Sequence, residues 1–315
     1  MDQYDVLSDV FSTLRLTSAL YFRAELSGRF AVEVPAEARR IRFHLVRHGT
    51  CRVSVPGQEP VTLAPGDVAL IPDGARQILS SDPSPAPVSL AELMAQGALS
   101  EGVLRNGEGA ASAGLLCGFC AFDESLDHPV LRDLPPLIVL RPGDLGAEPW
   151  TAAGLRLLHL EADFAGPGGT AILSRLIEIV VIQAARRSVG GPGGRPAGFL
   201  AALTDPALSR ALAAIHGAPE RDWRVVDLAR LAALSRAGFA RRFAETVGAT
   251  PIDYLTDWRL AKARALLSDT ALSMDDIAER CGYRSVPSFT RRFKARFGEG
   301  PGAFRRSRPV SNPRG

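Results

Sequence analysis

The sequence predicts an α+β protein: an N-terminal β-barrel or jelly roll followed by helices, and then an all-α C-terminal domain. Short apolar runs separated by turn residues extend from Thr17 to about Leu79, which is typical of a sandwich or barrel. Helical periodicity dominates after residue 151, and a Gly/Pro-rich linker at 188–199 divides the helices into two groups. A chain of 315 residues is long enough for two such domains.

The N-terminal elements follow from local periodicity. Residues 5–16 predict an amphipathic helix, which we interpret as a packing element. Strands are predicted next, at 19–24, 30–34, 41–46, 51–55 and 68–72. The segment 80–114 is rich in Ser, Pro, Ala and Gly, so we predict a loop with one or two helical turns at 89–94. Strand character returns at 115–122, and the β region ends with 134–140.

Helices are predicted on both sides of the linker. Those before it span 151–164 and 171–187, and one after it spans 205–216. The helix at 171–187 is apolar around most of its circumference, so several of its sides must be covered. A homodimer interface and burial within one subunit both account for this surplus, and we favour the dimer.

One short pattern occurs twice in the C-terminal part. Phe239-Ala240-Arg241-Arg242-Phe243, followed by Gly248 and Pro251, returns 50 residues later as Phe289-Thr290-Arg291-Arg292-Phe293, followed by Gly298 and Pro301. The phenylalanines of each copy lie four residues apart, so both rings share the helix face that packs into a core. An apolar helical stretch precedes each copy, and Ser235 or Ser285 is the N-cap between them. Each copy therefore predicts two short helices with a tight turn and an outward basic face.

Charge is divided unevenly along the chain. Residues 200–315 hold 20 Lys and Arg against 12 Asp and Glu, whereas the remainder holds 17 against 22. This asymmetry indicates that the C-terminal part binds a polyanion. The N-terminus lacks the pattern of a targeting signal, and no uninterrupted apolar stretch approaches about 18 residues. We therefore expect a cytoplasmic protein without a membrane partner.

Further motifs surround both copies of the repeat. They are Asp227-Leu228-Ala229, Gly248-Ala249-Thr250-Pro251, the stretch from Trp258 to Leu267, Ile277-Ala278, Cys281-Gly282-Tyr283 and Phe297-Gly298. Over about the last hundred residues this set resembles the AraC-type (AraC/XylS) family of transcription regulators. The resemblance implies a DNA-binding domain at 200–315, with helix-turn-helix units at about 224–246 and 274–297. A rigid helix at 252–267 joins them.

The outward faces of these units are the predicted contacts to double-stranded DNA. Arg241 and Arg291 are assigned to guanine base edges, and Ala237 and Ala240 to thymine methyl groups. Pro287 and Thr290 occupy the matching positions in the second unit. The remaining cations are assigned mainly to phosphates, and the two N-cap serines complete the set: Arg236, Arg242, Arg284, Arg292 and Lys294, with Ser235 and Ser285.

The stretch from Leu63 to Pro72 resembles the Pro-Gly-Asp turn and following strand of cupin jelly rolls, the usual N-terminal partner in this branch of the family. The resemblance implies a cupin-like regulatory and dimerisation domain at 1–187, with its β part at about 15–145. His44 is a weak metal candidate. Related proteins read His-Gly-x-x-His where this chain has Asp73-Gly74-Ala75-Arg76, so two histidines are absent and Arg76 would repel a cation. We expect no metal and no other cofactor.

The Cys-x-x-Cys pattern of Cys117 and Cys120 raises a second possibility. On a regular strand an offset of three residues puts the two thiols on opposite faces, unless a bulge at Gly118 brings them together. Zinc would need about two further ligands, and no second Cys-x-x-Cys or His pair is nearby in the sequence. A thiol switch that uses Cys117, Cys120 or Cys51 remains the alternative to small-molecule sensing, and oxidant sensing through such cysteines is known in the family.

Together these observations predict a sequence-specific transcription regulator, an activator or a repressor, whose cupin-like domain senses a small molecule. The expected partners are double-stranded DNA, RNA polymerase, a small-molecule effector and a second copy of the chain. A cupin enzyme is a distant alternative, because the metal-ligand histidines and any nucleophile or phosphate-loop pattern are missing. A non-specific DNA-binding protein is another. We expect no enzymatic activity.

Overall fold

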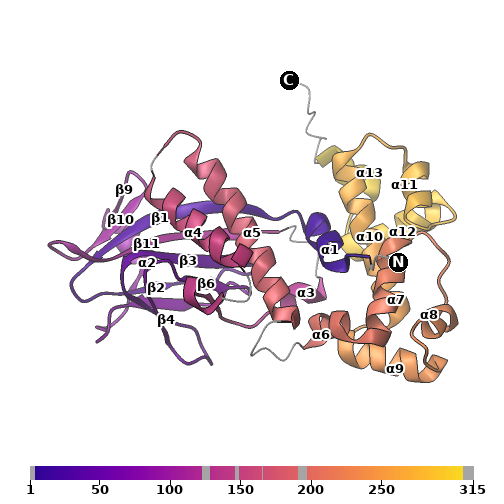
Figure 1. Cartoon of the computed structure of the whole chain (residues 1–315). Helices are drawn as coiled ribbons and strands as arrows, with labels where there is room; N and C mark the ends of the chain where they lie inside the picture. The colour runs from indigo at the N-terminus through magenta and orange to yellow at the C-terminus, as the bar shows by residue number, and fades with distance from the viewer. Residues whose placement is uncertain (1–3, 123–127, 146–148, 165, 191–196, 308–315) are drawn as a thin grey trace. The chain divides into compact units, whose positions relative to one another are not determined.

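The computed structural model describes residues 4–122, 128–145, 149–164, 166–190 and 197–307. It divides into two compact units (Figure 1). The first, here called the β unit, contains Leu16–Glu124 and Leu134–Pro192. The second, the helical unit, contains Gly193–Gly315 together with Met1–Arg15 and Ser125–Asp133.

The β unit is built on two sheets. The larger has seven strands in the order β12-β6-β3-β11-β1-β10-β9, and the smaller has five in the order β5-β4-β7-β2-β8. The strands are β1 (Thr17–Ser27), β2 (Ala31–Val34), β3 (Arg40–Gly49), β4 (Cys51–Ser54), β5 (Val61–Leu63), β6 (Val68–Ile71), β7 (Gln77–Ser80), β8 (Val88–Ser89), β9 (Leu99–Ser100), β10 (Val103–Asn106), β11 (Ala111–Ala121) and β12 (Ile138–Leu140).

The two sheets share one apolar core. Phe22 and Leu115 from the larger sheet and Val32 and Val53 from the smaller sheet belong to the same buried cluster. Strands β1 and β11 pair antiparallel along most of their length, and β11 also pairs with β3. The predicted β-rich N-terminal fold is therefore present, with the inward faces of both sheets removed from water.

The segment 80–114 differs from the predicted loop. It contains β8, helix α2 (Leu90–Ala95), β9, β10 and the start of β11. β8 pairs in parallel with β2, and β10 pairs in parallel with β1. Composition missed β8 and β10 because their pairing partners lie far back in the sequence, so local residue preferences carry little of the signal. The helical turns predicted at 89–94 correspond to α2.

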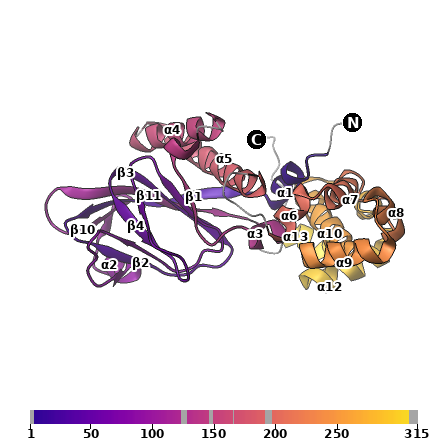
Figure 2. The same ribbon diagram turned by 60° about the horizontal axis from the view of Figure 1, so that its bottom comes forward.

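Two helices pack on the larger sheet. Helix α4 (Pro149–Asp163) and helix α5 (Gly169–Gly190) contact each other, and they also contact β3 and β1 respectively (Figures 1 and 2). Leu173, Ile177 and Val181 of α5 are buried within the unit. Other apolar side chains of the two helices remain exposed: Leu157, Leu160, Ile172 and Ile179. Burial inside the subunit therefore accounts for only part of the apolar surplus predicted for this region.

The helical unit contains ten described helices. They are α1 (Val6–Leu14), α3 (Pro129–Arg132), α6 (Gly198–Thr204), α7 (Pro206–Gly217), α8 (Val225–Leu231), α9 (Arg236–Val247), α10 (Pro251–Asp269), α11 (Met274–Arg280), α12 (Val286–Phe297) and α13 (Pro301–Ser307). α8 packs on α9, α11 packs on α12, and α10 contacts α9, α11 and α12. A long helix thus connects two short helix pairs.

Helices α1 and α3 belong to the helical unit, although the sequence analysis placed them in the N-terminal domain. α1 packs on α7 and α10, and α3 packs on α6 (Figure 1). Val10, Phe11 and Leu14 of α1 are almost completely buried there. The periodicity of residues 5–16 revealed an apolar face but carried no information about which partner covers it.

A sharp bend at Asp205 separates α6 from α7. The Asp205 carboxylate accepts hydrogen bonds from the backbone N–H groups of Ala207 and Leu208, and it thereby caps α7. None of the helices in the described ranges is alone long and apolar enough to cross a membrane; α6 and α7 meet that test only as a pair bent by 100°.

Candidate nucleic-acid interface

The repeated phenylalanines anchor two equivalent helices. Phe239 and Phe243 of α9 are fully buried with ring centroids 5.6 Å apart, and Phe289 and Phe293 of α12 have the same separation. Both helices begin at a serine N-cap and end at a glycine with a left-handed backbone. Because the aromatic face of each helix is fixed inward, the opposite face must point to solvent.

The predicted DNA-contact residues lie on these outward faces or at their N-terminal ends. All of them reach the surface: Ser235, Arg236, Ala237, Arg241, Arg242, Arg284, Ser285, Pro287, Arg291, Arg292 and Lys294 are exposed, and Ala240 and Thr290 are partly exposed. The structure therefore gathers the predicted residues into two similar accessible sets. Their roles toward bases and phosphates stay predictions.

The cations of these sets differ in their surroundings. Arg242 forms an ion pair with Asp205, the N-cap of α7. Arg284 pairs with Asp222 at 2.7 Å. Arg241 and Arg291 form no ion pair or hydrogen bond with any described residue. A guanidinium held by a carboxylate is oriented in advance, whereas an unpaired one can adapt to a base edge.

Helix α10 is tied to the segment between α7 and α8. Arg259 Nε donates to the Pro219 carbonyl at 2.6 Å, and its Nη2 donates to the Arg221 carbonyl at 2.8 Å. Gly282, just after α11, lies so close that a Cβ there would stand 2.7 Å from Arg259 Nη2. One arginine of the connecting helix therefore contacts both helix-pair regions.

The cysteines of the β unit do not converge in the way a Cys-x-x-Cys pair can. Cys117 joins the core shared by the sheets, whereas Cys120 lies near Glu178 of α5. The bulge hypothesised at Gly118 does not form. The register shift nearest to it lies in β1, between Leu20 and Phe22, which makes Tyr21 the extra residue. The strand alternation therefore holds, and the two thiols face opposite sides.

Cys117 instead contacts His44, the candidate metal ligand. His44 Nδ1 lies 3.1 Å from Cys117 Sγ, and His44 Nε2 lies 3.2 Å from the Gln77 amide nitrogen. Burial lowers the pKa of His44 to about 3, and nearby Arg42 adds to the effect. Burial also raises the pKa of Cys117 strongly and that of Cys51 to about 12. The histidine and both thiols are therefore neutral at physiological pH.

Both ring nitrogens of His44 are thus occupied by protein atoms. Among the described residues, no cluster of three or more His, Cys, Asp or Glu is arranged to hold a metal ion. Among the described residues, His44 forms hydrogen bonds with one sulfur and one amide, which is fewer than the three or four ligands of a zinc site.

Comparison with known proteins agrees with this geometry. Residues 5–190 match the cupin family, and residues 228–307 match the helix-turn-helix domain family. A putative AraC-like transcription regulator from Streptomyces lividans is 33% identical over 96% of this chain and 98% of its own length. The chain belongs to the AraC-type transcription regulators. It is a DNA-binding regulator with a cupin-like N-terminal domain.

Two further relatives of this AraC-type regulator cover most of both chains. The HTH-type transcriptional regulator AlkR of Acinetobacter baylyi is 30% identical over 96% of this chain and 99% of its own. The RCS-specific HTH-type transcriptional activator RclR of Escherichia coli is 28% identical over 84% of each chain.

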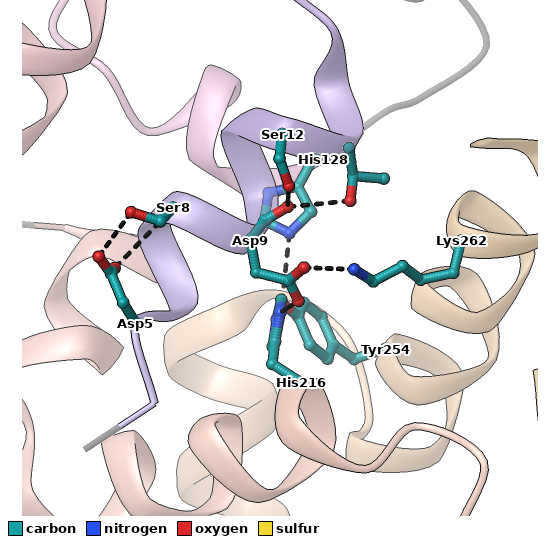
Figure 3. Close-up of polar contacts among 9 residues, drawn as sticks. Asp5, Ser8, Asp9, Ser12, His128, His216, Tyr254 and Lys262 are labelled. Carbon is teal, nitrogen blue, oxygen red and sulfur yellow. Dashed lines mark hydrogen bonds and ion pairs between the residues drawn. The ribbon is translucent and has the colours of Figure 1, made fainter. Parts of the chain in front are cut away.

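The AraC-type regulator also contains a buried polar network that the sequence analysis missed. His128, Tyr254, His216 and Asp9 form a chain of contacts within the helical unit, and Lys262 pairs with Asp9 (Figure 3). His216 ends the helix predicted at 205–216. Its position four residues after Leu212, on the apolar face of 205–216, was the available signal of burial.

The donors and acceptors of this network form one consistent sequence. The Val130 backbone N–H donates to His128 Nδ1 at 3.2 Å, so the proton of that ring is on Nε2, 3.2 Å from the Tyr254 hydroxyl. Tyr254 donates to His216 Nε2 at 2.7 Å, and His216 Nδ1–H donates to Asp9 Oδ2 at 3.0 Å. Every ring nitrogen is satisfied with both histidines neutral.

Electrostatics support these protonation states. Burial lowers the pKa of His216 more than the Asp9 carboxylate raises it. Burial also lowers the pKa of His128 well below its ordinary value, and His216 and Arg132 add to that effect. Burial alone would raise the pKa of Asp9, but the hydrogen bonds from His216 and Lys262 outweigh it and lower the pKa. Asp9 is therefore ionised and the histidines are neutral near pH 7.

Proposed function

We propose that this AraC-type regulator binds specific DNA sites through α9 and α12, and that its cupin-like β unit senses a small molecule. The observation that carries the DNA part is the pair of equivalent cationic helix faces, each fixed by two buried phenylalanines four residues apart. Helix-turn-helix proteins place such faces in the major groove. In this proposal α8–α9 and α11–α12 are the two units.

Base recognition falls to two of the cations that have no ion pair among the described residues. Arg241 and Arg291 contact guanine O6 and N7 in the proposal, since an adaptable guanidinium forms the bidentate contact that reads this base. Arg242 and Arg284, each held by an aspartate, contact phosphates and set the register of the protein on the duplex. Through α10 the two units enter successive major-groove turns, about 34 Å apart on one side of the DNA.

A competition experiment tests the DNA proposal. Fragments from the protein's own genomic neighbourhood are titrated with the full chain at two salt concentrations, with random-sequence DNA as competitor. One site should outcompete random DNA by about 10³-fold or more, and affinity should fall steeply with salt. Equal competition by random DNA would instead identify a non-specific DNA-binding protein.

A second copy of the chain is the proposed partner at α4 and α5. Leu157, Leu160, Ile172 and Ile179 are between 47% and 58% exposed, which is unusual for four large apolar side chains on two adjacent helices. Leu160→Asp should convert a dimer into a monomer in sedimentation velocity, and Arg230→Ala, which changes an exposed charge on α8, should not. A monomeric wild type would contradict the homodimer.

The remaining partners follow from regulator function. An effector occupies the cupin-like β unit in this proposal, and RNA polymerase is contacted at the regulated promoter. The protein carries out no catalytic step and acts in the cytoplasm. Transcription in a reporter strain with and without the gene decides whether it is an activator or a repressor.

Redox sensing is the second candidate. The contact of 3.1 Å between His44 Nδ1 and Cys117 Sγ favours Cys117 beside His44, rather than the Cys117/Cys120 pair, as the sensing site. Cys51 lies near enough to raise the pKa of Cys117 further. The relative RclR is named RCS-specific. In this alternative an oxidant modifies Cys117 or Cys51, and the modified side chain no longer fits the core between the sheets.

A further inference from the structure

A cavity of about 210 Å³ lies within the helical unit, apart from the outward faces of α9 and α12. Its walls come from four segments: the end of α1, helix α3, the stretch from the α9–α10 turn into α10, and the end of α12. Leu14, His128, Tyr254, Trp258 and Arg296 are among the lining residues. Segments from both ends of the sequence therefore enclose one space.

The inner wall combines apolar surface with satisfied polar groups. Leu14 and Trp258 supply apolar and aromatic surface, and both are almost completely buried. The Tyr254 hydroxyl and the His128 ring are already bonded to each other. The indole Nε1–H of Trp258 has no hydrogen-bond partner among the described residues, although the side chain is only 3% exposed. An unpartnered buried donor next to a cavity is a group that a ligand acceptor can satisfy.

The charges around the cavity favour an anion. Among the described residues that line it, Arg132 and Arg296 are the cations and Asp257 is the one carboxylate. Arg296 Nε lies 3.3 Å from Asp257 Oδ1, a long contact for a charged pair. A ligand carboxylate can therefore share the Arg296 guanidinium with Asp257, while the neutral His128 and Tyr254 add no competing charge.

We propose that this cavity binds a compact organic anion, with a carboxylate at Arg296 and Arg132 and a planar apolar body against Trp258 and Leu14. The volume is below the range of about 300–1,000 Å³ typical of sites for drug-sized ligands, so the occupant is a small metabolite with one ring or a short chain. The site lies outside the β unit, where the sensed molecule was placed above.

A ligand in the cavity would contact α10 and α12 directly. Arg296 lies in the last turn of α12, and Trp258 lies in α10, which connects the two helix pairs. A ligand that is bound more tightly in one arrangement of these helices shifts their equilibrium toward it. This consequence, unlike the site itself, rests on the proposed DNA-binding function.

The test uses the full chain and 4-(trifluoromethyl)benzoate, observed by ¹⁹F NMR, with 4-(trifluoromethyl)benzamide as the neutral counterpart of the same shape. We expect the benzoate to bind at least about tenfold more tightly than the amide, because a hydrogen bond between a guanidinium and a carboxylate is stronger than one between a guanidinium and a neutral amide. Equal binding of both probes would overturn the anion site.

Three variants test whether the probe binds in this cavity. Arg296→Gln should weaken benzoate binding about tenfold, and Ala249→Phe, which enlarges a partly exposed lining residue, should block both probes. Arg230→Gln removes an exposed arginine of α8 and should leave binding unchanged. Retention of tight binding in both Arg296→Gln and Ala249→Phe would overturn the proposal, and unchanged thermal unfolding of the variants excludes misfolding as the cause of a loss.

A separate experiment measures whether benzoate binding changes the affinity for DNA. Saturating benzoate should change the affinity for a specific site by about fivefold or more in wild type and not in Ala249→Phe, as expected for a coupling energy of about 1 kcal/mol. Probe binding with unchanged DNA affinity would overturn the coupling while the site stands. Absence of specific DNA binding altogether would contradict the proposed function, and the NMR result would remain independent of it.

Discussion

His216 Nδ1–H donates to Asp9 Oδ2 at 3.0 Å, a hydrogen bond between residues 207 positions apart in the chain. Lys262 of α10 pairs with the other oxygen of the same carboxylate (Figure 3). A single aspartate therefore connects α1 to both α7 and α10. Because the His216 side chain is completely buried, loss of this acceptor leaves a donor that water cannot reach.

Replacement of Asp9 should consequently destabilise the helical unit. We expect Asp9→Ala to lower the free energy of unfolding by about 3 kcal/mol, since it breaks a buried charged pair and leaves His216 unsatisfied. Asp9→Asn keeps an acceptor and should lose less. Asp5→Asn is the matched control, because Asn caps a helix about as well as Asp. Urea denaturation followed by tryptophan fluorescence measures all three, and equal losses for Asp9→Ala and Asp5→Asn would refute a role for the network.

Acidification should destabilise the protein below about pH 6.5. Burial holds the pKa of His128 and of His216 below the unfolded value near 6.5, so the unfolded chain binds more protons in this range. The free energy of unfolding should therefore decrease as the pH decreases, by up to about 1.4 kcal/mol per pH unit for each histidine. Urea denaturation at several pH values between neutrality and pH 5 checks the sign. A stability that rises as the pH falls would contradict neutral buried histidines.

Arg241 and Arg242 should differ in their effect on DNA binding despite being adjacent. Arg241→Ala should weaken binding to the specific site by about 1–3 kcal/mol and relax one base preference. Arg242→Ala should weaken binding to all sequences about equally and reduce the salt slope by about one. Site selection from random DNA at two salt concentrations distinguishes them. If Arg241→Ala weakens all sequences uniformly, Arg241 is a phosphate contact and the base assignment is wrong.

Gly282 and Gly298 provide a matched test of how α10 is anchored. Both have left-handed backbones, with φ of +72° and +82°, so alanine at either site should cost about 1 kcal/mol from backbone strain. Gly298 has open space around it, whereas a Cβ at Gly282 would stand 2.7 Å from both the Glu220 carbonyl oxygen and Arg259 Nη2. Gly282→Ala should therefore lower the melting temperature clearly more than Gly298→Ala. Equal shifts would show that the backbone at Glu220 and the Arg259 side chain move aside at little energetic cost.

The cysteines should react slowly in the folded protein. Burial raises the pKa of Cys51 and Cys120 to about 12 and that of Cys117 further, so alkylation by iodoacetamide should be on the order of a hundredfold slower than in urea. If an oxidant nevertheless changes DNA affinity, Cys117→Ser should abolish that response and Cys120→Ser should not. The reverse pattern would exclude the contact between His44 and Cys117 as the sensing site.

The repeat was the part of the site that the sequence could predict. Phe239, Phe243 and Arg241 lie within one helix, so spacing alone determined which side chains face the core and which face solvent. The parallel pairing of β10 with β1 and the contact of Asp9 with His216 were not predictable in this way. Both join segments far apart in the chain, and each local segment is compatible with several partners. Cys117 illustrates both cases: alternation predicted its separation from Cys120, and only the fold revealed its contact with His44.

The location of α1 in the helical unit also has a consequence during synthesis. α1 leaves the ribosome before α7 and α10, which cover its buried face and follow about 200 residues later or more. At about 5–20 residues per second the delay is about 10–40 s. Throughout that interval Val10, Phe11 and Leu14 have no native partner, so the nascent chain exposes an apolar helix that chaperones can bind. The environment of α1 is therefore completed only after the whole β unit, which lies between α1 and α7 in the chain, has been made.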